Sequence, residues 1–116
     1  MPGKWDSGFK KLFASNPQEA VDWLVPGAKF VRTKPLNLNN REIEVDLLYD
    51  LLLNEQACLL HTEFQTYGDE IMAMRMWEYN ALATSAYKVP VYSVLIYLRK
   101  TRKVAKPYYT WTFPNG

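Results

Sequence analysis

Two carboxylates that could hold a metal ion, Asp46 and Glu63, lie on the two arms of a predicted β-hairpin. If the hairpin turns near Glu55, Asp46 faces Phe64 or one of its neighbours, and directly opposed residues have Cβ atoms about 5 Å apart. A bulge or a one-residue shift of the turn brings Asp46 and Glu63 onto one face. Two carboxylates so placed repel each other unless a cation lies between them, and Mg²⁺ or Mn²⁺ prefers such hard oxygen ligands. The same residues are also ordinary on the solvated face of a hairpin, and spacing alone favours that simpler interpretation.

His61 and Gln65 share the face of Glu63, because side chains alternate along a strand. His61 has no second His or Cys at metal-ligand spacing, which argues against a zinc site. We expect His61 to have a structural role within the strand. The alternative is that it holds a metal-ligating side chain in place. Cys58 is the single cysteine of the chain, so it forms no intramolecular disulfide and is expected as a buried thiol.

A helix predicted over residues 70–88 places Arg75 inside an apolar stripe. The residues of that stripe are Ile71, Met72, Met76, Tyr79, Leu82, Ala83, Ala86 and Tyr87. A buried arginine needs a carboxylate or phosphate partner because an unpaired buried charge is costly, and the acidic hairpin is the nearest source of one. Extension of the side chain to solvent is an equally weighted alternative.

The expected order is an N-terminal helical region, three strands, a helix and a final strand. The expected helices are residues 6–13, capped by Asp6 or Ser7, a second helix with an Asn16 cap and Pro17 at its first position, and 70–88. The expected strands are residues 30–38, 41–53, 57–66 and 91–98, with a turn at 54–56 and a candidate extra strand at 108–113. This mixture predicts an α/β or α+β fold with a central mixed sheet flanked by helices.

The length and composition fit one soluble domain over residues 1–116. Hydrophobic residues make up 48% and charged residues 22% of the chain, which excludes a disordered chain or a coiled coil. No apolar run approaches the roughly 18 residues needed to cross a membrane. The first residues also lack the apolar stretch of a signal peptide, so we expect a cytoplasmic protein without membrane association.

The net charge of +2 is unevenly distributed along the chain. Residues 1–41 carry seven bases and three acids, residues 42–78 one base and nine acids, and residues 79–116 six bases and no acid. An acidic centre between basic flanks is expected where carboxylates hold a cation beside a polyanion. Chance distribution over solvated faces is the alternative, at even weight.

Five segments in order carry a resemblance to a known family. They are Asp6-x-x-Phe9-Lys10-x-x-Phe13, Glu44-Val45-Asp46-Leu47-Leu48, Leu59-Leu60-His61-Thr62-Glu63-Phe64-Gln65-Thr66, Arg75-Met76-x-x-Tyr79, and Val89-Pro90-Val91 with Val94-Leu95-Ile96-Tyr97-Leu98. Together they resemble the recombination-promoting nuclease and transposase group (the Rpn family), a branch of the PD-(D/E)XK nuclease superfamily. The resemblance covers nearly the whole chain and implies a restriction-endonuclease-like αβββαβ core.

The resemblance also implies a metal site. Asp46, Glu63 and the backbone carbonyl of Phe64 would be the ligands of Mg²⁺ or Mn²⁺. Gln65 stands where many superfamily members have a lysine that orients or deprotonates the attacking water. Because a neutral amide can only position that water, the metal itself would have to activate it.

Supporting roles follow from the same resemblance. Arg75 would orient a carboxylate or neutralise phosphate, Tyr79 belongs to the matching helix motif, and Glu19 would be an acid that some members bring to the metal from a helix. Relatives continue beyond the position of Gly116, so we expect the chain to be a fragment, a minimal member or a decayed one.

The predicted function is therefore a metal-dependent DNA endonuclease linked to recombination or mobile elements. Basic residues near the C-terminus would follow the DNA backbone: Arg99, Lys100, Arg102 and Lys103. RNA in place of DNA stays open as the substrate. The alternative is a non-catalytic nucleic-acid-binding or protein-interaction module that keeps the nuclease fold, with a homodimer as one form of that interaction.

Overall fold

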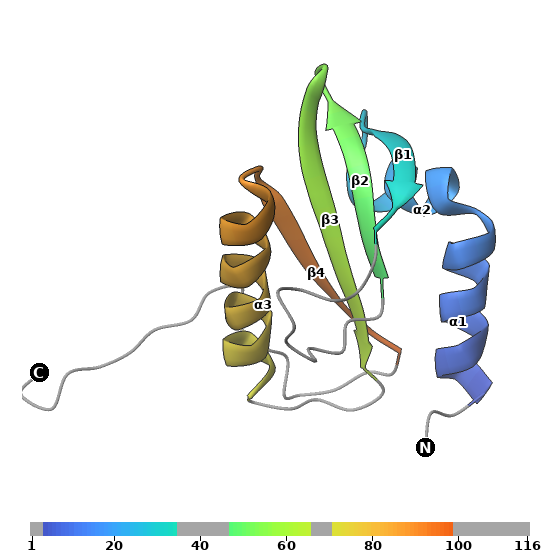
Figure 1. Cartoon of the computed structure of the whole chain (residues 1–116). Coiled ribbons are helices and arrows are strands. Elements are labelled where there is room, and N and C mark those ends of the chain that lie inside the picture. The colour runs from blue at the N-terminus through green and yellow to red at the C-terminus, as the bar shows by residue number, and fades with distance from the viewer. Residues whose placement is uncertain (1–3, 35–46, 66–70, 99–116) are drawn as a thin grey trace, which may run out of the picture.

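A four-stranded mixed sheet with helices on both faces makes up the part of the chain that the computed structural model describes, residues 4–34, 47–65 and 71–98 (Figure 1). The elements in chain order are α1 (Lys4–Ser15), α2 (Pro17–Leu24), β1 (Lys29–Thr33), β2 (Leu47–Leu53), β3 (Gln56–Gln65), α3 (Met72–Tyr87) and β4 (Val91–Tyr97). This confirms the predicted mixed α and β class. Asp46 and the candidate strand at 108–113 lie outside the described residues.

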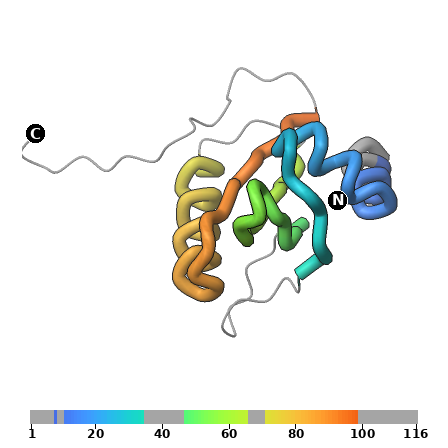
Figure 2. The backbone as a smooth tube through the Cα atoms, turned by 90° about the horizontal axis from the view of Figure 1, so that it is seen from above, coloured from blue at the N-terminus to red at the C-terminus, as the bar shows by residue number. Residues whose placement is uncertain are grey.

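The sheet has the order β1-β2-β3-β4, with β1, β2 and β3 antiparallel and β4 parallel to β3. A parallel neighbour requires a crossover connection, and α3 lies within the segment that joins β3 to β4. Figure 2 places the sheet between α3 on one side and α1 and α2 on the other. The face under α3 is therefore separated from the face under the two N-terminal helices.

Alternating side chains of β2 and β3 fill a separate apolar cluster on each face. Towards α2, the cluster is built on Val21, Val25, Ala28, Tyr49, Leu51, Cys58 and Leu60. Towards α3, it is built on Leu48, Leu59, Tyr79 and Ala83. Cys58 is buried, as predicted.

The hairpin between β2 and β3 is tighter than predicted. Leu53 pairs with Gln56, so the turn contains Asn54 and Glu55 alone, with φ of +52° and +66°. Positive φ at both central residues is what two-residue hairpins require. Because Gln56 joins β3, the pairing is offset by one residue from the expected one, and its last described pair is Leu47 with Thr62.

Several helix boundaries differ from the predictions. α1 begins at Lys4, so Asp6 and Ser7 lie inside its first turn and the expected cap is wrong. Asn16 does precede α2, with Pro17 at its start as predicted, but the Asn16 side chain makes no capping bond. Ile71 precedes α3 and is 66% exposed, so it does not belong to the buried stripe. α3 ends at Tyr87, and the next residue, Lys88, has a left-handed φ of +56° where the chain turns towards β4.

None of the helices in the described ranges has the length and apolar character needed to cross a membrane.

Candidate functional site

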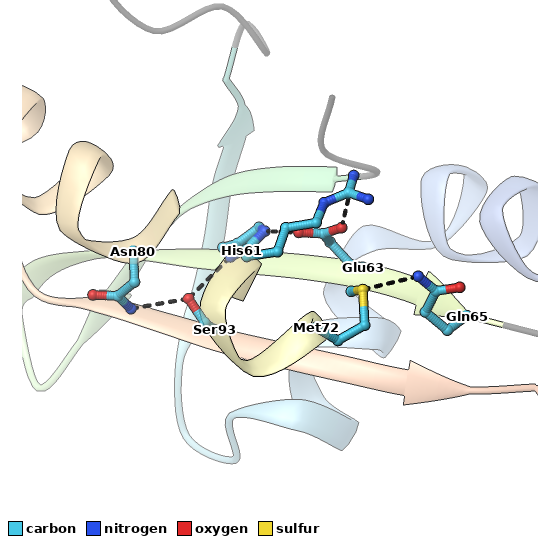
Figure 3. Close-up of polar contacts among 7 residues, drawn as sticks. His61, Glu63, Gln65, Met72, Asn80 and Ser93 are labelled. Atoms are coloured by element: carbon cyan, nitrogen blue, oxygen red, sulfur yellow. Dashed lines mark hydrogen bonds and ion pairs between the residues drawn. The ribbon is translucent and has the colours of Figure 1, made fainter. Parts of the chain in front are cut away.

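Glu63 lies near the end of β3, on the face covered by α3, and is only 3% exposed. His61, Glu63 and Gln65 follow each other along this face, as the strand alternation predicted (Figure 3). A carboxylate in such a position needs charged or hydrogen-bonding partners, because removal from water is costly. β3 is flanked on both sides by β2 and β4, so the site is built on the centre of the sheet.

Both oxygens of Glu63 have partners. Oε1 lies 3.2 Å from Nη2 of Arg75 on α3, and Oε2 lies 2.9 Å from Nε2 of His61. The sequence predicted that the acidic hairpin could supply a carboxylate partner for Arg75, and Glu63 is that partner. The Arg75 side chain is also 43% exposed, so it reaches solvent while it holds the carboxylate.

His61 links Glu63 to α3 and β4. Its ring is fully buried, and Nδ1 lies 2.9 Å from the hydroxyl oxygen of Ser93 on β4. Asn80 on α3 donates from Nδ2 to the same hydroxyl at 2.9 Å (Figure 3). It also donates from Nδ2 to the carbonyl oxygen of Val91 at 2.8 Å. A chain of hydrogen bonds therefore runs from α3 through β4 to Glu63.

Sequence reasoning did not single out Asn80 or Ser93. Both carry a detectable signal, because Asn is a poor residue for the middle of a helix and Ser93 interrupts the otherwise apolar and aromatic β4. Each residue type fits poorly by local propensity and is explained here by its side-chain hydrogen bonds. The pairing of the two could not be predicted, because it depends on how α3 packs against β4.

Tyr79 lies beside this chain with its ring centre 4.2 Å from that of His61. It is fully buried, and within the described part of the chain its hydroxyl has no hydrogen-bond partner. Burial, together with the negative charges of Tyr87 in its ionised form and of Glu63, raises the pKa of Tyr79 to about 12. The hydroxyl therefore stays protonated at neutral pH and can donate a hydrogen bond.

Gln65 and Phe64 offer different groups to the site. The Gln65 amide donates from Nε2 to the sulfur of Met72 at 3.0 Å, at the first turn of α3. The Phe64 side chain points to the opposite face, where its ring packs edge-on against Phe13 at 5.2 Å. On the face of Glu63, Phe64 can therefore contribute only its main chain, as the predicted carbonyl ligand requires.

The structure does not bring Glu19 to this site. Glu19 is exposed on α2, and α2 packs on the other face of the sheet through Ala20 and Val21. The remaining predicted residues lie outside the described residues: Asp46, Arg99, Lys100, Arg102 and Lys103.

Glu63 is a ligand of the type that a hard cation prefers, because it is a carboxylate, but its Oε1 is already paired with the positive charge of Arg75. One carboxylate is not enough to hold Mg²⁺ or Mn²⁺, and no group of three or more His, Cys, Asp or Glu side chains in residues 4–34, 47–65 and 71–98 is arranged to do so. Asp46 is the candidate for the second carboxylate.

Comparison of the chain with protein-family models, curated proteins and solved structures found no match. The functional assignment therefore depends on the chemistry of Glu63 and its neighbours.

Proposed function

We propose that the protein is a divalent-metal-dependent DNA endonuclease that hydrolyses phosphodiester bonds, with a role in recombination or mobile elements as its resemblance implies. The observation that carries the proposal is the burial of Glu63 beneath α3, where Arg75 and His61 hold its two oxygens. Glu is almost never fully buried unless it is paired, so a buried, paired Glu63 is an informative feature of this sheet. A polar surface hairpin, the simpler interpretation of the sequence, does not account for this burial.

The arrangement of the strands supports a restriction-endonuclease-like core. Three antiparallel strands, a helix and a strand parallel to the third follow one another in the order that the αβββαβ topology requires. The chain has one helix more than this topology, since both α1 and α2 come before β1, and α2 covers one face of the sheet. We propose this core as the finer description of the mixed fold.

The register of the hairpin favours Asp46 as the partner of Glu63. Asp46 directly precedes Leu47, and Glu63 directly follows Thr62, which is the partner of Leu47. A ladder continued by one pair would set the two carboxylates directly opposite each other, with Cβ atoms about 5 Å apart. Asp46, Glu63 and the Phe64 carbonyl would then hold Mg²⁺ or Mn²⁺, which when bound lowers the pKa of water and stabilises negative charge on phosphate.

The chain's own side chains would position the reactants. Arg75, whose side chain is 43% exposed, would orient Glu63 through their ion pair or neutralise the charge of a phosphate. The Gln65 amide can orient a water by hydrogen bonds but cannot accept its proton. The Tyr79 hydroxyl is a donor, and the basic residues 99–103 would follow the DNA backbone.

Nicking of supercoiled plasmid in Mg²⁺ and in Mn²⁺ tests this proposal. The wild type should nick the plasmid, EDTA should stop it, and Asp46→Asn and Glu63→Gln should each lose the activity. Glu55→Gln is the matched control, since it removes an exposed acid of the same hairpin and should leave nicking unchanged. Equal nicking by the wild type and both site variants, or none by the wild type, would contradict the proposal.

A non-catalytic module that keeps this fold is the second candidate. It is favoured by one observation, namely that both oxygens of Glu63 are already satisfied by protein groups. This candidate predicts that the wild type binds nucleic acid or a protein partner yet neither binds Mn²⁺ nor nicks plasmid.

If the wild type is a nuclease, the same assay with a labelled RNA decides whether DNA or RNA is cleaved.

A further inference from the structure

We infer that α3, acting through Ser93, and Glu63 fix the tautomer of His61 from its two sides, and that His61 thereby fixes the side chain of Glu63. The hydrogen-bond chain from Asn80 to Ser93, His61 and Glu63 has one direction, with each group donating to the next. His61 and Ser93 are thus positioning residues for the carboxylate. Their effect on catalysis rests on the proposed function, whereas the tautomer does not.

The direction of the chain is set at Asn80. The carbonyl oxygen of Val91 can only accept a hydrogen bond, so the Asn80 atom 2.8 Å from it must be the amide nitrogen. The same nitrogen lies 2.9 Å from the Ser93 hydroxyl oxygen, and it has a second hydrogen to donate there. Since the Ser93 oxygen accepts from Asn80, its own hydrogen is free to point at His61.

The other end of the chain requires the same arrangement. An ionised carboxylate is an acceptor only, so the 2.9 Å contact between Glu63 Oε2 and His61 Nε2 needs a hydrogen on Nε2. Nδ1 then carries a lone pair and accepts from Ser93 at 2.9 Å. Both ends therefore assign the hydrogen to Nε2, which donates to Glu63, and the lone pair to Nδ1, which accepts from Ser93.

The opposite direction would need one more acceptor than these contacts supply. If His61 donated from Nδ1, the Ser93 oxygen would receive donors from both His61 and Asn80, and its own hydrogen would need a third partner. His61 is fully buried and its ring lies against Tyr79, so the ring has little freedom to turn away.

This arrangement assigns different tasks to the two oxygens of Glu63. Oε2 is held by the buried His61, while Oε1 faces Arg75, whose side chain is half in solvent. Under the proposed function, Oε1 is the oxygen that a cation approaching from solvent would meet. His61 would hold the carboxylate in the rotamer that presents it, as partners behind a metal ligand commonly do.

The single histidine of the chain makes the tautomer directly measurable. Two-bond ¹H–¹⁵N correlation spectra of the full chain at neutral pH, without metal, contain the signals of one imidazole ring. The wild type should show a protonated Nε2 and an unprotonated Nδ1. A ring protonated on Nδ1, or on both nitrogens, would overturn the inference.

Two variants test the control of the ring by α3. Asn80→Asp replaces the donor with an acceptor, so the Ser93 hydrogen turns towards α3. The hydrogen bond from Ser93 to Nδ1 of His61 should then be lost, which shifts the Nδ1 signal, while Nε2 keeps its hydrogen towards Glu63. Ser93→Thr keeps the hydroxyl on a strand that favours β-branched residues, and it should give the wild-type spectrum. An unchanged ring spectrum in a folded Asn80→Asp protein would refute control by α3.

Nicking assays on Ser93 variants test the positioning role separately. Ser93→Ala should lower the rate by about 10- to 100-fold, the usual effect of losing a group behind a metal ligand, and Ser93→Thr should restore it. If Ser93→Ala nicks like the wild type, His61 does not position Glu63 for catalysis. If the wild type does not nick at all, the proposed function fails, while the metal-free spectrum still decides the tautomer.

Discussion

Replacing Tyr79 with Phe should stabilise the metal-free protein. The Tyr79 hydroxyl is buried and has no partner among the described residues. Burying a hydroxyl without a hydrogen bond costs about 1–3 kcal/mol, and Phe keeps the ring that packs against His61. After allowance for the small space left by the lost oxygen, we expect a gain of about 1 kcal/mol in the free energy of unfolding.

Tyr49 provides a matched control on the other face of the sheet. It is also buried, and burial raises its pKa too, but its hydroxyl donates to the carbonyl oxygen of Phe13 at 3.1 Å. Tyr49→Phe loses that bond and leaves the carbonyl unsatisfied, so it should cost about 1–2 kcal/mol. The same chemical change should therefore have opposite signs at the two positions.

Urea unfolding followed by circular dichroism measures both effects. The free energy of unfolding falls by about 1.5 kcal/mol per molar urea in a protein of this size. A difference of about 2 kcal/mol between the two variants therefore separates their urea midpoints by more than about 1 M. Under the proposed function, Tyr79→Phe should also slow nicking although it is more stable, because a donor is lost from the site, whereas Tyr49→Phe should not. Destabilisation of Tyr79→Phe as large as that of Tyr49→Phe would refute the reasoning.

Three further measurements follow from the structure. Because the pKa of Tyr79 rises from 10 to about 12 on folding, the folded state keeps a proton that the unfolded state loses. The free energy of unfolding that this proton contributes is fully present below pH 10 and is lost as the pH rises to 12. Between pH 10 and 12, the free energy of unfolding of the wild type, measured by urea titration, should therefore fall by on the order of 2 kcal/mol more than that of Tyr79→Phe. Glu55→Gly relieves the positive φ in the hairpin turn and should raise the thermal midpoint, with a gain of about 0.5–1 kcal/mol; a lower midpoint would contradict the turn geometry. Arg32→Ala removes an ion pair to Asp50 in which the arginine is 70% exposed, so chemical denaturation should show a loss below about 0.5 kcal/mol.

The main elements of the fold could be predicted because their patterns are strong. The apolar and β-branched run of β4 and the apolar stripe of α3 each gave the correct element. For Arg75 the sequence left two outcomes open, a carboxylate partner from the hairpin and extension to solvent. The structure shows both, because Arg75 pairs with Glu63 and its side chain is also exposed.

The hairpin register was beyond sequence reasoning for a local reason. A two-residue turn with positive φ at both positions is usually marked by Gly at the second position, and this chain has Glu55 there. Long-range pairing between β2 and β3 imposes the turn on an unfavourable residue. The one-residue offset matters for the site, since it determines which residue faces each position near Glu63.

The hydrogen-bond chain at Glu63 depends on tertiary packing. Asn80 and Ser93 are 13 residues apart and meet only because α3 folds back over β4. His61 could be placed on the face of Glu63 by alternation, but not joined to Ser93, because the β3–β4 register was unknown. That register pairs His61 directly with Ser93.

Titration calorimetry with Mn²⁺ tests the central claim most directly, because it asks whether Glu63 and Asp46 together hold a cation. The wild type should bind Mn²⁺ at a saturable site, and Asp46→Asn and Glu63→Gln should each abolish the binding while Glu55→Gln retains it. Absence of Mn²⁺ binding by the folded wild type, or unchanged binding in both site variants, would contradict the proposed metal centre.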